Sequence, residues 1–311
     1  MKYEKFKEHE IKRTCDEKFD KYLKYGGMPM LVNMNDILLP AQKKGYGVGF
    51  FNAVNMEMAR AVIETAEELQ MPVMVGTAEI LLPAMDLAHV ASYLIPLAEK
   101  ASVPVCVHYD HGLTFERCME AIELGFTSIM YDCSTEDYET NVRKVAEMVA
   151  ICHAKGITVE GELGHVGDNE GAGKLANPSD YYTDPAMAED FVRRTGVDSL
   201  AVAVGNAHGD YKFPPKLDFD RISAIAKATG VPLVLHGGSG LSDEDFRLAV
   251  KRGVCKVNIF TDIDKAGKAG VEEGIAAGAK TMMGLIPYEI AAMKRVAEEK
   301  IRLFAADSTL V

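Results

Sequence analysis

The sequence has little that would attach it to a membrane or to nucleic acid. It contains no apolar run of the roughly 18 or more residues that a membrane-spanning helix needs. It holds 34 Lys and Arg against 46 Asp and Glu, which gives a formal net charge of −12. Bulk attraction to DNA, RNA or an anionic lipid surface is therefore not expected, although a local basic pocket for a small phosphate stays open.

Cysteine is scarce, and its spacing shows no motif of paired cysteines. The six cysteines are scattered, form no CxxC pair and mostly lie inside apolar segments. In a chain of 311 residues, this distribution predicts buried, reduced thiols, not a disulfide framework or a zinc ribbon. The N-terminal region is rich in charge and lacks the apolar core of a secretory signal. We therefore expect a cytoplasmic protein.

What remains is an ordinary globular composition, 48% hydrophobic and 26% charged. The length suits either two average domains or one large α/β barrel. Apolar residues over 2–24 recur mostly every three to five positions and are followed by Gly26 and Gly27, which predicts an amphipathic helix. We expect an N-terminal helical extension, residues 1–27, packed on the main body or on another subunit, and one α/β domain, residues 28–311.

After residue 28, short apolar runs rich in β-branched residues alternate with stretches of helical periodicity. Eight of these runs predict strands: 46–53, 71–76, 103–110, 127–132, 157–163, 197–204, 231–237 and 254–260. Alternating strands and helices imply parallel strands with helical crossovers, and eight strands close a (β/α)8 TIM barrel. A doubly wound open sheet is the alternative, because the number of strands does not prove closure.

Reactive side chains gather where the predicted strands end, which is where the loops of such a barrel carry its chemistry. His111, His208 and His236 each stand beside a glycine at the end of a different strand. In a closed barrel they would converge, and three imidazoles with an open fourth position make a catalytic zinc site. A single histidine at a strand end is more often a hydrogen-bonded structural residue, so the prediction depends on all three.

Other polar residues accompany these histidines. Glu160 and Glu162 lie in the strand predicted over 157–163. His108 shares a strand face with Asp110, and we expect it to support the site at most. The polar, glycine-rich segment 164–182 is long for a loop inside a compact domain, and we expect it to form a lid.

The last two predicted strands end in HGGSG (236–240) and NIFTD (258–262). Loops in these positions of a barrel often bind phosphate through backbone N–H groups and a helix N-terminus. Glycine lets the backbone approach an oxyanion, and Ser239 and Thr261 can add hydroxyl donors. The alternative is that these glycines only form tight turns. A phosphate in this position would place a phosphorylated substrate against the metal.

HYDHG, NAHG and HGGSG, in this order and spacing, resemble the zinc-dependent class II ketose-bisphosphate aldolases, which include fructose- and tagatose-bisphosphate aldolases. The resemblance covers roughly residues 29–305 and extends to GYGVGFFNAVN, EGELGHVGDNE and CKVNIFTD. It implies reversible cleavage of a phosphorylated ketose to dihydroxyacetone phosphate and an aldehyde through an enediolate. It also implies Zn²⁺ as cofactor, room for a monovalent cation near the phosphate, and a homodimer or homotetramer.

The resemblance assigns metal ligands residue by residue. The zinc ligands would be His111, His208 and His236. Glu162 matches a family carboxylate beside the metal, which can serve an alternative metal position.

The resemblance also assigns catalytic and substrate-binding residues. Asp110 matches the acid that exchanges the substrate's hydroxyl proton, and Glu170 matches a loop glutamate that moves the proton next to the carbonyl. Asn258 would help to hold the enediolate. The implied site for dihydroxyacetone phosphate consists of Gly209, Gly237, Gly238, Ser239, Asn258, Ile259, Phe260 and Thr261.

Two departures from the family pattern concern the distal half of the substrate. Phe260 stands where the family typically has aspartate or alanine, and no arginine occurs between it and Arg295, where the family often binds a second phosphate. A ketose 1-phosphate that lacks the 6-phosphate is therefore an alternative substrate.

Three further alternatives concern the chemistry. A lysine Schiff base is the other route to an aldolase, and the predicted strand ends offer few lysines, with Lys212 and Lys256 the nearest. We therefore favour the metal route. A metal-dependent barrel hydrolase and a non-catalytic sugar-phosphate binder are the remaining alternatives. Asp110 and Glu170 argue against the binder, because a protein that only binds needs no acid–base pair.

Overall fold

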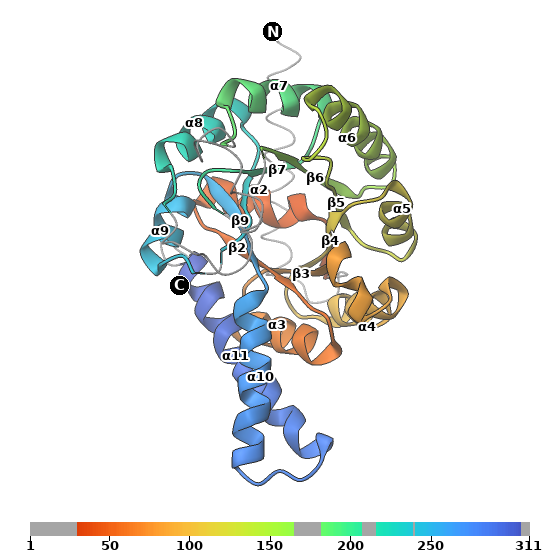
Figure 1. The fold of residues 1–311 in the computed structure, drawn as a ribbon, viewed down its shortest axis with the longest axis vertical. Coiled ribbons are helices and arrows are strands. Elements are labelled where there is room, and N and C mark those ends of the chain that lie inside the picture. Colours follow the sequence, from red (N-terminus) through yellow and green to blue (C-terminus); the bar gives the residue numbers. More distant parts are fainter. Residues whose placement is uncertain (1–29, 165–181, 207–215, 239, 306–311) are drawn as a thin grey trace.

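The computed structural model describes residues 30–164, 182–206, 216–238 and 240–305. Strands and helices alternate along most of the chain, with the strands in a central ring, most helices around it and α2 across one end (Figure 1). The predicted N-terminal extension, residues 1–27, lies outside the described residues, as does most of the predicted lid.

Eight parallel strands close into a barrel. The sheet has the order β1-β4-β3-β2-β9-β8-β7-β6-β5, and the additional pairing of β4 with β5 closes the ring. This closure confirms the predicted (β/α)8 barrel and excludes the open sheet. The two-residue strand β1 (Leu31–Val32), which the sequence did not predict, pairs with the beginning of β4. The barrel strands are β2 (Val48–Asn52), β3 (Val73–Ala78), β4 (Val105–Gly112), β5 (Ser128–Tyr131), β6 (Thr158–Leu163), β7 (Ser199–Val202), β8 (Leu233–Leu235) and β9 (Val254–Ile259).

Helices α2 to α9 each begin where the sequence supplies a capping side chain, whereas α10 begins after Phe260 without one. Asp137 accepts a hydrogen bond from the backbone N–H of Thr140 at the start of α6, and Ser242 with Asp245 forms a capping box at the start of α9. The helical elements are α2 (Met34–Lys44), α3 (Met56–Leu69), the 3₁₀ helix η1 (Glu79–Ala84), α4 (Leu87–Lys100), α5 (Phe115–Glu123), α6 (Tyr138–His153), α7 (Pro185–Thr195), α8 (Phe219–Thr229), α9 (Asp243–Lys251), α10 (Thr261–Ala276) and α11 (Met282–Ala305).

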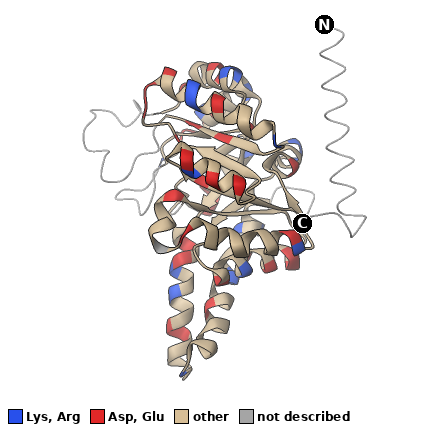
Figure 2. Ribbon diagram, turned by 90° about the vertical axis from the view of Figure 1, so that its right-hand side faces the viewer, with Lys and Arg blue, Asp and Glu red and all other residues tan. Residues whose placement is uncertain are grey.

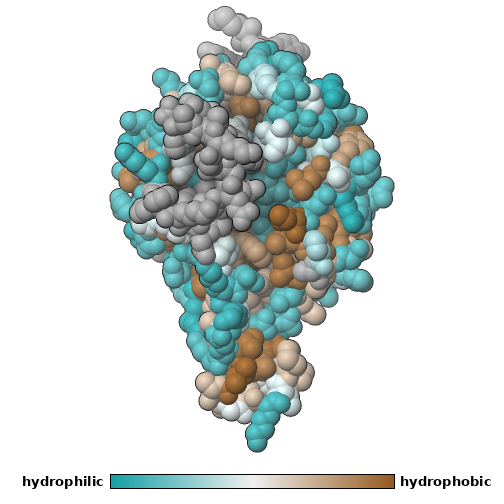
Figure 3. Space-filling view, in the orientation of Figure 1, coloured by the Kyte–Doolittle hydropathy of each residue, from teal (hydrophilic) through white to brown (hydrophobic). Residues whose placement is uncertain are grey.

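Charged side chains cover much of the outer surface, and one projection carries an apolar patch at its tip (Figures 2 and 3). Acidic and basic residues are spread over the outer helices (Figure 2). Helices α10 and α11 form a hairpin that extends away from the barrel, and its tip carries apolar surface (Figures 1 and 3). In the described part of the chain, no helix is both long and apolar enough to cross a membrane.

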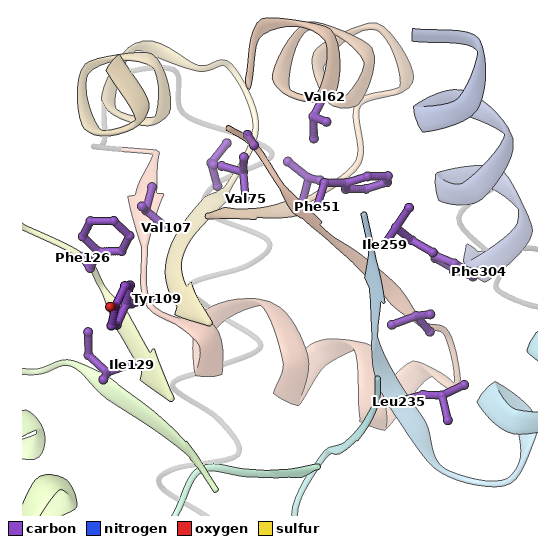
Figure 4. Packing of buried hydrophobic residues seen from close by; sticks show 14 of the residues in the cluster. Phe51, Val62, Val75, Val107, Tyr109, Phe126, Ile129, Leu235, Ile259 and Phe304 are labelled. Atoms are coloured by element: carbon purple, nitrogen blue, oxygen red, sulfur yellow. The ribbon is translucent and has the colours of Figure 1, made fainter. Parts of the chain in front are cut away.

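Apolar side chains fill two regions around the strands. Phe51, Val62 and Val75 belong to the large core between the strands and the outer helices, where Phe304 of α11 also packs (Figure 4). A smaller cluster, which includes Met34 and Ile37 of α2, fills one end of the barrel interior with Phe50. Helix α2 follows β1 and covers the end where the strands begin, so the polar site forms at the end where the strands finish.

Candidate active site

Polar side chains from five strands meet at the C-terminal end of the barrel. One ligand atom from each of Asp110, His111 and His236 lies within 4.8 Å of the other two, and His111, Asp132 and Glu162 form a second such group. These residues follow or end β4, β5, β6 and β8. Asn258 of β9 reaches the same site, because its side-chain amide donates a 3.1 Å hydrogen bond to Asp110.

A β-bulge in β4 directs two consecutive side chains toward the site. Tyr109 pairs with Ile129 but Gly112 pairs with Tyr131, so β4 holds one residue more than β5 across this interval. An extra residue breaks the regular alternation of side chains along a strand. The backbone accommodates the extra residue at His111, whose φ is +42°, a conformation that is rare outside glycine. Asp110 and His111 can therefore both contribute to one cluster.

Glycine at position 112 is required for this bulge. A Cβ added there would lie 2.5 Å from the Sγ of Cys118 and 2.8 Å from the carbonyl oxygen of Met130. The backbone after His111 therefore passes directly against β5 and α5, and no larger residue fits.

The candidate metal ligands are oriented by hydrogen bonds. Nδ1 of His111 is 2.8 Å from Oδ2 of Asp132, which fixes the ring, and the His111 and His236 rings meet edge to face with centroids 4.5 Å apart. Burial alone would lower the pKa of His111, but the charge of Asp110 and the hydrogen bond of Asp132 outweigh it and raise this pKa to about 10. The cluster thus attracts positive charge strongly.

The side chain of Glu162 supports a cation in this position. Its Oε2 atom is buried, accepts no hydrogen bond from any described residue and lies 3.4 Å from Nδ1 of His236. Burial and the nearby charge of Asp132 raise the pKa of Glu162 to about 8. A buried carboxylate oxygen without a donor is costly, and a metal ion would compensate for it. Imidazole nitrogens with carboxylate oxygens are a donor set that suits a divalent transition metal.

Asp110 is held between two asparagines. Its Oδ2 accepts a 2.9 Å hydrogen bond from the amide of Asn52, and its Oδ1 accepts the bond from Asn258. Burial alone would raise the pKa of Asp110, but the charges of His111 and Lys256 outweigh it and hold this pKa well below its ordinary range. Asp110 is therefore an ionised carboxylate with a fixed orientation. Asn52 was not among the predicted site residues, although it lies near the end of the strand predicted over 46–53, and strand ends identified the other site residues.

A buried ion pair lies beneath the cluster. Glu160 accepts hydrogen bonds from Nε2 of His236 at 2.9 Å and from Nζ of Lys256 at 2.8 Å, and all three side chains are fully buried. Nζ of Lys256 also lies 4.5 Å from the ring centroid of Phe50. Lys256 is thus committed to an ion pair within the barrel, whereas a Schiff-base lysine needs a free amine that faces the substrate. Lys212 lies outside the described residues.

His108 supports the same network from below. Its Nδ1 is 2.7 Å from Oγ of Ser128, and its Nε2 lies 3.7 Å from Glu160 and 3.8 Å from Asp110. Burial and the charge of Lys256 lower the pKa of His108 to about 3, so the imidazole is neutral. This placement agrees with a supporting position for His108.

The two predicted phosphate-binding segments lie side by side. A Cβ added to Gly238 would lie 3.4 Å from the carbonyl oxygen of Asn258, so the backbones after β8 and β9 are in close contact. Helix α10 begins at Thr261, and Phe260 immediately before it is half-buried. Ile259 instead packs its side chain into the outer core, so only its backbone can contact a ligand (Figure 4).

Some predicted site residues have no described position. His208, Glu170, Gly209 and Ser239 lie outside the described residues. The structure therefore brings together Asp110, two of the three predicted histidines, Glu162 and Asn258.

The closed barrel and its cluster of imidazole and carboxylate ligands define a (β/α)8-barrel enzyme with a site suited to a metal ion. The family profile described as "Fructose-bisphosphate aldolase class-II" matches residues 32–309, and the chain belongs to this family. It is therefore an aldolase, a carbon–carbon lyase, of a metal-dependent class.

Individual relatives agree with this assignment. The chain is 40% identical to the Escherichia coli K12 protein YdjI over 267 residues, covering 86% of this chain and 95% of YdjI. A crystal structure described as the YdjI aldolase superposes with a TM-score of 0.80 at 36% identity, covering 90% of this chain and 100% of that one. A fructose-bisphosphate aldolase of Staphylococcus epidermidis is 37% identical over 246 residues, 78% of this chain and 85% of that protein.

Substitution of His111 tests the metal site against a matched histidine. His111 and His153 each lie 2.8 Å from an aspartate, but His153 is on the outer surface of α6. We expect His111→Ala to lower metal affinity more than about 100-fold, because the loss of a direct ligand should exceed the effect of losing a residue that only orients one. His153→Ala should bind metal like the wild type. Competition with a chromophoric chelator measures the metal affinity of each variant. An unchanged affinity in His111→Ala would exclude His111 as a ligand.

Proposed function

We propose that the chain is a Zn²⁺-dependent aldolase that reversibly cleaves a phosphorylated ketose, of the fructose or tagatose 1,6-bisphosphate type, to dihydroxyacetone phosphate and an aldehyde. The observation that carries the proposal is the position of an ionised Asp110 beside His111 and His236. Membership of the class II aldolase family favours this chemistry over a barrel hydrolase or a sugar-phosphate binder.

In the proposed reaction the protein moves two protons. Asp110, held by Asn52 and Asn258, accepts the hydroxyl proton of the ketose when the carbon–carbon bond breaks, and returns it to the aldehyde oxygen in the reverse direction. Glu170 is proposed to protonate the enediolate at the carbon next to the carbonyl after cleavage, and to remove that proton in the reverse direction. When bound, Zn²⁺ supplies Lewis-acid stabilisation of the negative charge that develops on the substrate oxygens. His111, His208 and His236 would hold it, with Glu162 at an alternative position.

The phosphate is proposed to bind where the backbones after β8 and β9 meet. Gly237 and Gly238 can offer backbone N–H groups there, and α10 directs its N-terminus toward the same region. Gly209, Ser239 and Thr261 complete the proposed site, with Asn258 on the reacting half of the substrate. A monovalent cation near this phosphate stays a prediction from the family resemblance.

The distal half of the substrate has a second candidate. Arg295, the first arginine after Phe260, bonds to Glu273 on the exposed side of the α10–α11 hairpin. It is 60% exposed and is committed to a partner outside the barrel. This arrangement supplies no arginine for a second phosphate from that segment, so a ketose 1-phosphate is a comparison substrate in the test below.

Release of dihydroxyacetone phosphate from a panel of ketose phosphates tests the proposed function. The panel holds fructose and tagatose 1,6-bisphosphates beside ketose 1-phosphates that differ at the sixth carbon. We expect chelator-sensitive cleavage of a bisphosphate, restored by Zn²⁺. Cleavage of 1-phosphates alone would retain the reaction but change the substrate. If no member is cleaved by the zinc-loaded protein, the proposed function is wrong.

Asp110 provides the matched test of mechanism in the same assay. Asp110→Ala should bind zinc and lose cleavage, because the group that accepts the hydroxyl proton is gone; a loss of about 100-fold or more is expected. Wild-type cleavage in Asp110→Ala would remove this residue from the mechanism.

We also propose a cytoplasmic location. The five described cysteines are buried free thiols, which suits a reducing compartment.

The proposed assembly is a homodimer or homotetramer. The hairpin tip exposes Ile275, Met282 and Met283 by 60%, 68% and 80%, and a second copy of the chain would cover them (Figure 3).

A charge at this tip should therefore weaken assembly. We expect Met283→Glu to lower the mass measured by light scattering, whereas Met187→Glu, at an exposed methionine of α7, should leave it unchanged. A wild-type mass near the 33.9 kDa of one chain would contradict the proposed oligomer.

A further inference from the structure

The β4 bulge is held from outside the barrel by one carboxylate. Glu79 is the first residue of η1, directly after β3. Its Oε2 accepts hydrogen bonds from the hydroxyl of Tyr109 at 3.1 Å and from the backbone N–H groups of Leu113 at 2.7 Å and Thr114 at 3.3 Å. One oxygen atom therefore contacts the chain immediately before and immediately after Asp110, His111 and Gly112.

This carboxylate makes its contacts away from the polar cluster. Tyr109 is fully buried in the outer core, where its ring meets Phe126 edge to face with centroids 5.9 Å apart. Glu79 is itself half-buried, and its other oxygen, Oε1, accepts a 3.4 Å hydrogen bond from Oγ1 of Thr114. Thr114 caps α5 through the backbone N–H of Arg117. Glu79 thus joins the end of β3, both sides of the bulge and the start of α5.

The bulge needs such a restraint. The positive φ of His111 is unfavourable for a residue with a side chain, and such conformations persist only where the surroundings enforce them. The pairing of Gly112 with Tyr131 holds the strand from the β5 side, while Glu79 holds it from the β3 side. If the Glu79 contacts are lost, the chain from Asp110 to Gly112 can relax toward regular alternation, which turns His111 away from Asp110.

We propose that Glu79 is a positioning residue for the aldolase reaction, because it fixes the bulge that directs Asp110 and His111 to one metal and one substrate. The proposal rests on the proposed function. Glu79 does not touch the reacting atoms, so its loss should change turnover and metal affinity more than KM.

The chain offers a matched control at the other end of the same strand. Glu67 of α3 is also half-buried, and its Oε1 accepts a 2.7 Å hydrogen bond from the backbone N–H of Ser102, shortly before β4 begins. Glu67 and Glu79 therefore make the same kind of bond to backbone N–H groups, Glu67 shortly before β4 and Glu79 directly after it. Only Glu79 is next to the bulge.

The experiment compares full-length Glu79→Ala, Glu79→Gln and Glu67→Ala. Zinc affinity is measured by chelator competition. The values of kcat and KM are measured on the best substrate of the panel, and Tm is measured on the metal-free proteins. We expect Glu79→Ala to lose about 10- to 100-fold in zinc affinity and in kcat with a smaller change in KM. Glu79→Gln keeps a carbonyl oxygen that can accept the hydrogen bond from the backbone N–H of Leu113, so it should retain most of the zinc affinity and of kcat. Glu67→Ala should retain wild-type affinity and kcat, even if its Tm falls.

Three outcomes would overturn the proposal. They are wild-type zinc affinity and kcat in Glu79→Ala, equal losses in Glu67→Ala, or a loss confined to Tm. If Glu79→Ala does not fold, Tyr109→Phe decides, because it removes one bond to Glu79 and keeps the buried ring; we expect a several-fold loss of kcat, and no loss would overturn the proposal. Failure of the wild type to bind zinc or to cleave any substrate would instead count against the proposed function.

Discussion

The pairing of β4 with β5 is the contact on which the rest of the molecule depends. It closes the barrel, and its one-residue bulge determines where Asp110 and His111 point. Without closure, β4 and β8 would not bring His111 and His236 together; without the bulge, strand alternation would separate His111 from Asp110. The fold and the chemistry of the site are therefore linked through one short ladder of hydrogen bonds.

Charge inside the barrel explains why the site is held so firmly. Glu160 bonds to both His236 and Lys256, while the amides of Asn52 and Asn258 hold Asp110. Burial of charge is unfavourable unless each group has a partner. If one partner is removed, the other remains buried and charged without compensation, which destabilises the protein. The network thus restricts each side chain to one orientation before any ligand binds.

Much of the fold could be predicted from the sequence, because buried parallel strands appear as apolar runs and each run found here corresponds to a strand of the barrel. The strand ends also located Asp110, His111, Glu162, His236 and Asn258. The bulge, the two-residue strand β1 and the contacts of Glu79 and Lys256 could not be predicted, because each depends on the register between strands that are far apart in sequence. The catalytic and metal-binding roles of the residues at the strand ends remain predictions, as do the positions of His208 and Glu170.

The most direct measurement is the exchange of the C3 proton of dihydroxyacetone phosphate with deuterium in D₂O, with no aldehyde present. An aldolase that stabilises an enediolate should catalyse this exchange, lose it when a chelator removes the metal, and regain it when Zn²⁺ is restored. A zinc-loaded protein that shows no exchange would contradict the proposed chemistry, because a hydrolase or a sugar-phosphate binder has no need to remove that proton.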